Sequence, residues 1–390
     1  MKPRLALNMI IGPGDAQMLN RLMSSFDMKK LFDEIVLVRT TNDPEVIQVI
    51  NQFADKTSYY EWCTPAFPKG NFGGARDAAR LMTSSEYIIW LDADDMLSSE
   101  DDLLKVFVKL RTFFEMHPDI DYFVCPYILT LSEEGVPVNV LSRERIFKRQ
   151  TTICWEKPVH EQLTIDTEVH KRVDLKGLDV VHCPLKDGKV SAARNLEILE
   201  LEYWKHARDD RHNAFYYARD LIQSDRWEPA IPVLVDYIDT FDGDLRCLYE
   251  AAQMLAKYFL YKQAPGAPTL CETTSPLAEK YARLCLSITE ENAEPLAILG
   301  DTYISKRRNK DAIKMFKLAI AKKFGTGSLQ DRVYYEEIPA RRLSDLFICE
   351  NELEQAIWYN KVARKHAPND KQLIEQRKVI ITKLGETICQ

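Results

Sequence analysis

The sequence predicts two domains of different class: an α/β domain over residues 1–195, built on a mostly parallel sheet with helices on both faces, and an all-α repeat domain over residues 196–390. Three observations support this division. Short apolar runs alternate with helical patterns in the first half, which is typical of a parallel sheet. Strand-like runs are almost absent from the second half. Small alanines recur there at intervals typical of helical repeats.

The first half alternates strand and helix in a regular order. Strands are expected at 5–11, 34–39, 58–63 and 87–91, and helices at 17–28, 44–53, 75–83 and 103–116. The run YIIWL at 87–91 is continuous and apolar, as a strand buried on both faces should be. The order changes after residue 120, and strands at 122–131, 145–149 and 178–182 are expected to add a mixed or antiparallel extension to the sheet.

The second half consists of amphipathic helical patterns. Helices are expected at 215–223, 228–237, 245–261, 276–288, 295–305, 310–322, 340–350, 353–366 and 372–384. Alanine recurs on the second helix of each pair, at Ala230, Ala278, Ala312 and Ala356. The 34 residues from Ala278 to Ala312 match the period of the tetratricopeptide (TPR) repeat, and the other two intervals contain longer loops. An irregular helical bundle is the alternative.

Composition excludes several classes of protein. The chain has 390 residues, of which 46% are hydrophobic and 28% charged, so an ordinary globular protein is expected. A net charge of −7 excludes proteins that bind nucleic acid mainly through their charge, although a local basic groove stays open. No run of about 20 apolar residues occurs, so no membrane span is expected.

The N-terminus and the cysteines bear on localisation. The apolar run at 5–11 is short, contains Asn8 and leads into GPGD (12–15) in place of a cleavage site. It is therefore expected to be a strand and not a signal peptide. The nine cysteines include no CxxC pair, which excludes zinc ribbons and thioredoxin-type motifs. Free thiols in apolar surroundings fit a reducing, cytoplasmic location.

An acidic segment follows the run at 87–91. Because residues i and i+2 of an extended chain point the same way, Asp92 and Asp94 can present two carboxylates together at the carboxyl end of a buried strand. Open α/β sheets bind their ligands at such strand ends. Two carboxylates that share a hard cation with diphosphate oxygens and water form the usual site for Mg²⁺ or Mn²⁺.

This segment has two other possible interpretations, a calcium loop and a helix cap. A calcium loop is excluded, because Met96, Leu97 and Leu103 stand where that loop needs an oxygen ligand, glycine and glutamate. A helix cap is the structural alternative, since Asp95, Ser98 and Ser99 precede a helix. Capping by Ser98 or Ser99 is compatible with metal binding by the two aspartates.

The segment that contains this acidic pair resembles part of a known protein family. The segment NFGGARDAARLMTSSEYIIWLDADDML (71–97) is similar to the donor-site segment of family 2 glycosyltransferases of the GT-A fold. The pattern of that family is a helix with Ala-Arg-Asn, then an apolar strand, then Asp-Ala-Asp, which is the DXD motif. Further matches follow in order: EIVLVRTTNDPEVI (34–47), FVCPYIL (123–129), RERIFKR (143–149), WEKPVHEQL (155–163), VVHCP (180–184) and KVSAARNLEILELE (189–202). WEKPVHEQL resembles a Val-His-Glu signature of the subgroup with TPR repeats, which includes bacterial peptide glycosyltransferases that modify bacteriocins. The resemblance covers roughly residues 4–240.

The resemblance implies a chemistry and a set of site residues. It implies an inverting transfer of sugar from a nucleotide sugar, with a UDP-sugar as the first choice, assisted by Mn²⁺ or Mg²⁺. His182 is implied as a third metal ligand beside Asp92 and Asp94, and Glu161 as the general base that takes the acceptor's proton. The residues implied in donor binding are Asp43, Arg76, Asp92, Lys189 and Arg194.

Without the resemblance these residues have ordinary structural interpretations. His182 would be a core histidine, Glu161 a surface strand residue, and Lys189 and Arg194 a solvated helix start. Asp119 and Asp121 are weaker candidates for the base, because the segment HPDIDYF is typical of a turn. A zinc protease is excluded, because Thr164 stands where an HExxH motif needs its second histidine.

The chain departs from the family pattern at three places. GPGD (12–15) replaces Lys-Asn-Glu, Arg39 or Thr40 replaces an aspartate, and Ala-Arg-Asp (75–77) replaces Ala-Arg-Asn. These positions surround the nucleotide base in the family, so the base and the sugar of the donor stay open.

Two functions of different class remain. The first is a metal-dependent glycosyltransferase that recognises its acceptor partly through the repeats. A peptide or protein acceptor is expected first, ahead of a cell-envelope glycan or a modified base of phage-type DNA. The second is a non-catalytic scaffold with a degenerate GT-A domain, which the presence of Asp92, Asp94, Glu161 and His182 disfavours. A nucleotidyltransferase is disfavoured, because this sequence has no evident Gly-rich basic loop after its first strand. The helical half is also a candidate surface for a homodimer.

Overall fold

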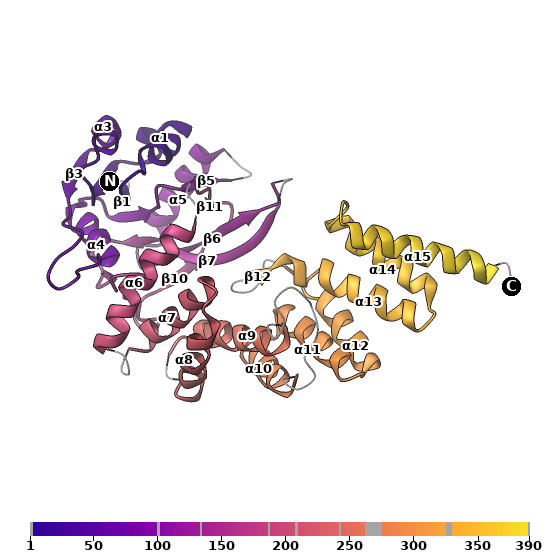
Figure 1. Cartoon of the computed structure of the whole chain (residues 1–390). Coiled ribbons are helices and arrows are strands. Elements are labelled where there is room, and N and C mark those ends of the chain that lie inside the picture. Colours follow the sequence, from indigo (N-terminus) through magenta and orange to yellow (C-terminus); the bar gives the residue numbers. More distant parts are fainter. Residues whose placement is uncertain are drawn as a thin grey trace. The chain divides into compact units, whose positions relative to one another are not determined.

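The computed structural model describes residues 3–388 except 100–101, 133–134, 186–187, 207–209, 242, 262–274 and 325–329. Side chains are also left out at 188–192, 205–206 and 386–388. The chain forms two compact units, Met1–Arg226 and Trp227–Gln390. Figure 1 shows strands and helices together in the first part of the chain and helices in the second. The predicted α/β domain followed by helical repeats is therefore confirmed.

The first unit is built on a mixed sheet. Its strands lie in the order β3-β2-β1-β4-β7-β6-β11-β5, with β10 beside β6. The bounds are β1 Leu5–Ile11, β2 Glu34–Arg39, β3 Lys56–Tyr59, β4 Tyr87–Trp90, β5 Asp95–Ser98, β6 Tyr122–Leu131, β7 Pro137–Lys148, β10 Arg172–Asp174 and β11 Asp179–His182. The first four strands are parallel, whereas β7 is antiparallel to both β4 and β6. A separate hairpin pairs β8 (Trp155–Glu156) with β9 (Gln162–Leu163).

Helices cover both faces of this sheet. The bounds are α1 Ala16–Ser25, α2 Met28–Leu31, α3 Pro44–Phe53, α4 Phe72–Met82, α5 Leu103–Met116, α6 Gly188–His206 and α7 Arg211–Gln223. Apolar side chains of α1, α2, α3 and α5 share one core with alternate residues of β1, such as Leu7 and Met9. On the other face, Ala75 and Ala79 of α4 pack against Ile10. Strand β1 is buried along its whole length because both its faces are covered.

Two details differ from the sequence predictions. The third strand lies at Lys56–Tyr59 and not at 58–63. The predicted cap formed by Asp95, Ser98 or Ser99 is wrong, because Asp95–Ser98 forms β5 and pairs with β11. The cap of α5 is Asp102, whose side chain accepts a hydrogen bond from Leu104 N. Pairing with a strand about 80 residues later is a tertiary effect that the local pattern does not contain.

The second unit is helical, with the expected repeat character. Its helices are α8 Trp227–Asp239, α9 Leu245–Tyr261, α10 Ser275–Ile288, α11 Glu294–Ser305, α12 Asn309–Ile320, α13 Glu337–Cys349, α14 Leu353–His366 and α15 Lys371–Ile388, and a short segment before α13 contains β12 (Gln330–Asp331) and the 3₁₀ helix η1 (Arg332–Tyr334). The four recurring alanines, Ala230, Ala278, Ala312 and Ala356, are all fully buried. Their small side chains let neighbouring helices approach closely, as the repeat pattern predicted.

The division between the units falls later than the boundary expected at residue 195. Helices α6 and α7 belong to the first unit, which ends at Arg226. They pack on each other, with the rings of Tyr203 and Tyr217 stacked 4.6 Å apart. The side chain of Lys157, from the loop after β8, reaches Asp210 before α7 at 2.6 Å. None of the helices that the structure describes combines the length and the apolar character needed to cross a membrane.

Candidate active site

The candidate site lies where the order of the strands reverses. Strand β1 pairs with β2 on one side and with β4 on the other. Because β1 and β4 are parallel, both end at the same edge of the sheet, and the loops after Ile11 and Trp90 diverge there. Such a reversal leaves a crevice outside the carboxyl ends of the strands, which is the usual ligand position in open α/β sheets.

Three potential metal ligands meet at this edge. The carboxylates of Asp94 and Asp95 and the imidazole of His182 each offer a ligand atom, and these atoms lie within 4.8 Å of one another. Antiparallel pairing of β5 with β11 sets Asp95 opposite His182. The Nδ1 atom of His182 lies 3.7 Å from Asp94 Oδ1 and 3.2 Å from the Tyr127 hydroxyl. The fold therefore brings together residues that are about 90 positions apart in the sequence.

The Asp95 carboxylate is anchored by a buried ion pair. Its Oδ2 lies 2.9 Å from Arg145 Nη1, and neither side chain is exposed. The guanidinium of Arg145 lies over the rings of Trp90 and Tyr127, at 4.0 and 4.2 Å. The other oxygen, Asp95 Oδ1, is buried 3.9 Å from His182 Nδ1 and accepts no hydrogen bond from the described residues. An acceptor left without a donor beside a second carboxylate and an imidazole fits a cation-binding site.

The electrostatics of this cluster favour a bound cation. Burial, and after it the charge of Asp92, raises the pKa of Asp94 to about 6. The carboxylate of Asp95, and then that of Asp94, raises the pKa of His182 against the opposing effect of its burial. The raised pKa of His182 thus reflects the carboxylates around it, whereas burial is the larger cause for Asp94.

Arg76 cross-links two of the predicted site residues. Its Nη2 donates to Asp92 Oδ1 at 2.5 Å, and its Nε donates to Glu161 Oε1 at 2.6 Å. The guanidinium is 6% exposed and lies over the rings of Trp90 and Trp155. Burial is the largest influence on Asp92 and by itself would raise its pKa, but the charges of Arg76 and Arg145 and the hydrogen bond from Arg76 together lower that pKa. One oxygen of Asp92 is thus paired with Arg76, whereas the three-residue cluster contains Asp95, and metal binding by Asp92 stays a prediction.

The loop that carries Glu161 packs against the N-terminus of α4. Phe72 N donates to Pro158 O at 2.8 Å, and Gly73 N donates to Lys157 O at 3.2 Å. These carbonyls satisfy amide groups that have no partner inside a helix. The close approach of this loop to α4 requires glycine at position 73, because a Cβ at Gly73 would lie 2.4 Å from Lys157 O. One oxygen of Glu161 is held by Arg76, and no other hydrogen bond to this carboxylate occurs among the described residues.

Three residues predicted to bind the donor, Asp43, Arg194 and Lys189, remain to be located. Asp43 caps α3, where its Oδ1 accepts from Glu45 N and its Oδ2 from Gly14 N in the loop after β1. Arg194 is exposed over the ring of Phe72, near enough to Glu161 for their charges to interact. The side chain of Lys189 lies outside the described part of the chain.

Three residues of this site are not predicted from the sequence. Asp95 is predicted as a cap, and no site role is predicted for Arg145 or Tyr127. A signal for Arg145 existed, because along β7 it alternates in phase with Phe147, which is fully buried. An arginine on the buried face of a strand needs a carboxylate partner. No local signal pointed to Tyr127.

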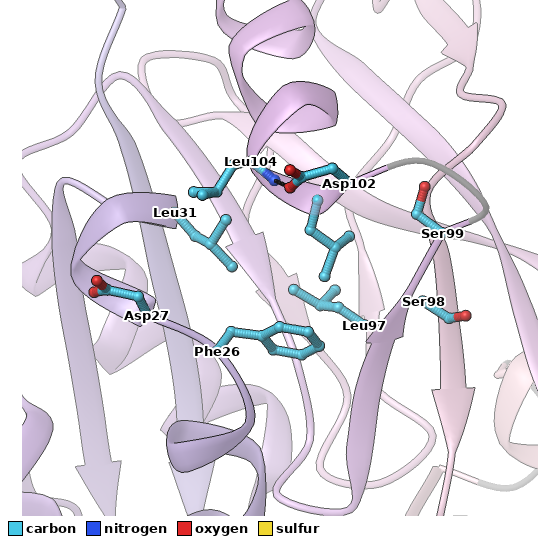
Figure 2. Close-up of a pocket in the computed structure, with 9 residues that line it drawn as sticks. Phe26, Asp27, Leu31, Leu97, Ser98, Ser99, Asp102 and Leu104 are labelled. Atoms are coloured by element: carbon cyan, nitrogen blue, oxygen red, sulfur yellow. Dashed lines mark hydrogen bonds between the residues drawn. The ribbon is translucent and has the colours of Figure 1, made fainter.

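Two hollows in the first unit lie apart from this cluster. One, of about 450 Å³, lies at the far end of β5 from Asp95, where Phe26, Leu31 and Leu97 point toward one another (Figure 2). The carboxylate of Asp102 at its rim is engaged in capping α5. The second, of about 470 Å³, is an open groove beside α4 between Tyr60 and Trp155. Neither hollow contains the three-residue cluster.

Comparison with known proteins places the chain near a glycosyltransferase. No protein-family model matches it. It is 25% identical over 248 residues to the SPbeta prophage-derived glycosyltransferase SunS of Bacillus subtilis, covering 60% of this chain and 54% of SunS. The chain thus spans about half the length of the curated relative it matches.

Solved structures give more distant likenesses. A TPR protein of Thermus thermophilus is similar over 50% of this chain and 93% of its own, with 16% identity and a TM-score of 0.35. The mannosyltransferase PcManGT of Pyrobaculum calidifontis, solved with GDP-Man and Mn²⁺, is similar over 80% of this chain and 88% of its own. Its identity is 12% and its TM-score 0.37.

Proposed function

We propose that the chain is a metal-dependent, inverting glycosyltransferase that moves a sugar from a nucleotide sugar to a peptide or protein. The observation that supports this best is the meeting of Asp94, Asp95 and His182 at the reversal of the strand order, beside the Asp92–Arg76–Glu161 chain. The sequence similarity to SunS supports the same reaction class.

The residues present fit a divalent cation. The region has four carboxylates, those of Asp92, Asp94, Asp95 and Glu161, but only two guanidinium groups. Arg76 pairs with Asp92 and Glu161, and Arg145 pairs with Asp95. Such a site repels the diphosphate of a nucleotide sugar until positive charge is added. Oxygen ligands and one imidazole suit Mn²⁺ or Mg²⁺. A cation held by Asp94, Asp95 and His182 supplies charge that stabilises the departing diphosphate.

Glu161 is the proposed general base. Arg76 holds Oε1, which fixes the carboxylate while Oε2 stays available to take the proton of an acceptor hydroxyl or thiol. The deprotonated acceptor then attacks the anomeric carbon as the bond to the nucleoside diphosphate breaks. Attack on the side opposite the leaving group inverts the anomeric centre. Arg76 and Arg194, which lie near Glu161, are the proposed partners of the negatively charged donor.

The proposed donor is a UDP-sugar and the proposed acceptor a peptide. Support for a peptide comes from the helical repeats, a class of architecture that offers extended binding surfaces. The resemblance of WEKPVHEQL to the peptide-modifying subgroup points the same way.

The test is a screen of the purified chain with Mn²⁺ and a panel of nucleotide sugars, in which released nucleoside diphosphate and intact acceptor mass are measured. Candidate peptides, a cell-envelope glycan and DNA serve as separate acceptors. We expect turnover with at least one donor and a mass increase of one sugar on a peptide. Turnover that Glu161→Gln and Asp94→Asn do not reduce would contradict the proposed site. Absence of turnover with every donor would favour the scaffold alternative.

A further inference from the structure

The loop between β8 and β9 holds two residues in a strained backbone conformation. Lys157 has φ 69° and His160 has φ 48°, and neither is glycine. Left-handed conformations of this kind cost about 1–3 kcal/mol each and persist only where the surroundings enforce them. His160 directly precedes Glu161, so whatever holds His160 also sets the position of the proposed base.

Helix α7 holds His160 from several directions. The His160 Nε2 atom lies 2.7 Å from Asp220 Oδ2, and Arg219 donates to Nδ1 at 3.0 Å. Because Nδ1 accepts a hydrogen bond, the ring is neutral and Nε2 donates to Asp220. The imidazole stacks on Tyr216 with centroids 4.4 Å apart, and His212 Nε2 donates to the backbone carbonyl of His160 at 3.0 Å. These contacts leave the ring a single orientation.

Asp220, the partner of His160 Nε2, is deeply buried and lies far from the proposed base in the sequence. Asp220 is 1% exposed and lies 60 positions after His160. It belongs to α7, which follows the sheet in the chain and yet is part of the same compact unit. On the opposite side of the loop, the amides of α4 and the Arg76 guanidinium hold residues 157–161. The loop is thus fixed between α4 and α7.

We infer that α7 positions the proposed base: Asp220, acting through His160, fixes the backbone that places Glu161 against Arg76. This inference rests on the proposed function for the role of Glu161. Asp220 and His160 are positioning residues, and a displacement of about 1 Å at a reacting group lowers turnover about 100-fold. Donor binding depends on other groups and is expected to be little affected.

The first test compares three variants in the full chain with the donor that supports turnover. Asp220→Ala removes the acceptor for His160 Nε2, and we expect kcat to fall about 10–100-fold with the donor KM within twofold. Asp220→Asn keeps an acceptor oxygen and is expected to restore kcat to within about threefold of wild type. Leu221→Ala is the matched control, because Leu221 is fully buried on the same helix. A kcat for Asp220→Ala equal to that of Leu221→Ala would overturn the inference.

The second test does not depend on catalysis, so it separates this inference from the proposed function. Amide hydrogen exchange of residues 155–163 is measured in the same variants. We expect exchange to accelerate in Asp220→Ala and to stay near the wild-type rate in Asp220→Asn and Leu221→Ala. If wild type transfers no sugar to any acceptor, the proposed function fails and this measurement alone decides whether α7 holds the loop. Unchanged exchange in Asp220→Ala would refute the positioning role.

Discussion

The carboxylate of Asp95 and the guanidinium of Arg145 form an ion pair 2.9 Å long in which neither side chain is exposed. Removing one partner of such a pair leaves an uncompensated buried charge, which typically costs about 3–5 kcal/mol. We therefore expect Arg145→Met to lower the free energy of unfolding by about that amount, measured by urea denaturation. The double variant Asp95→Asn/Arg145→Met should be more stable than Arg145→Met alone. A double variant that is less stable than Arg145→Met would contradict this account.

The second prediction concerns the metal. Asp94→Asn is expected to weaken Mn²⁺-dependent binding of UDP at least tenfold, because it removes a charged ligand from the cluster of Asp94, Asp95 and His182. Titration calorimetry with UDP and Mn²⁺ measures the change. Asp119→Asn is the matched control, since that carboxylate is exposed and paired with Lys171. Equal affinities in both variants would exclude Asp94 as a metal ligand.

The third prediction concerns Glu161. Glu161→Gln keeps the shape and an acceptor for Arg76 but cannot take a proton, so kcat with a hydroxyl acceptor should fall about 10²–10⁴-fold. The affinity for UDP and Mn²⁺ should stay close to that of wild type. A kcat within threefold of wild type would exclude Glu161 as the base. A thiol acceptor needs a base less than a hydroxyl does, so the test uses a hydroxyl acceptor.

The fourth prediction concerns pH and the core. Glu34 is buried, which alone would raise its pKa, but Lys56, at 2.7 Å, and donors from Ser85 and Ser84 lower the pKa to about 2. A carboxyl whose pKa is lower in the folded than in the unfolded chain contributes stability that is complete above pH 4.5. That contribution is lost as the pH falls from about 4.5 toward 2.

Urea denaturation at a series of pH values tests this assignment. Glu34→Gln should lower the free energy of unfolding by about 1–3 kcal/mol at pH 7. The same variant should lose less stability than wild type between pH 5 and pH 3, a window of about two units that covers the upper part of this titration. Equal losses in the two proteins would show that other carboxyls dominate acid unfolding.

The fifth prediction concerns the boundary between the units. Residues 227–390 are expected to fold alone with a strongly helical circular dichroism spectrum, since repeat helices stabilise their neighbours. The fragment 1–226 is expected to be more stable than 1–195, because the shorter one lacks Asp210 and Asp220, the partners of Lys157 and His160. Equal thermal stability of the two N-terminal fragments would instead support a boundary at residue 195.

The sequence by itself determined the main course of the chain. Short apolar runs between helical patterns located β1, β2, β4 and most helices, because these patterns arise from local periodicity. The repeated alanines predicted the packing of the second unit, since a helix that approaches another closely needs a small residue at each contact. The acidic pair after β4 and the signature around Glu161 predicted the region of the candidate site, because both lie in short segments with a recognisable order.

Only the tertiary structure decided which of these groups act together. Asp95 joins Asp94 and His182 because β5 pairs with β11, a contact between segments about 80 residues apart. Arg76 links Asp92 to Glu161, because its guanidinium reaches both carboxylates. Likewise, α7 is part of the first unit, where its Asp220 meets His160. Each of these pairings depends on side chains that are distant in sequence, so neither periodicity nor spacing along the chain could indicate them.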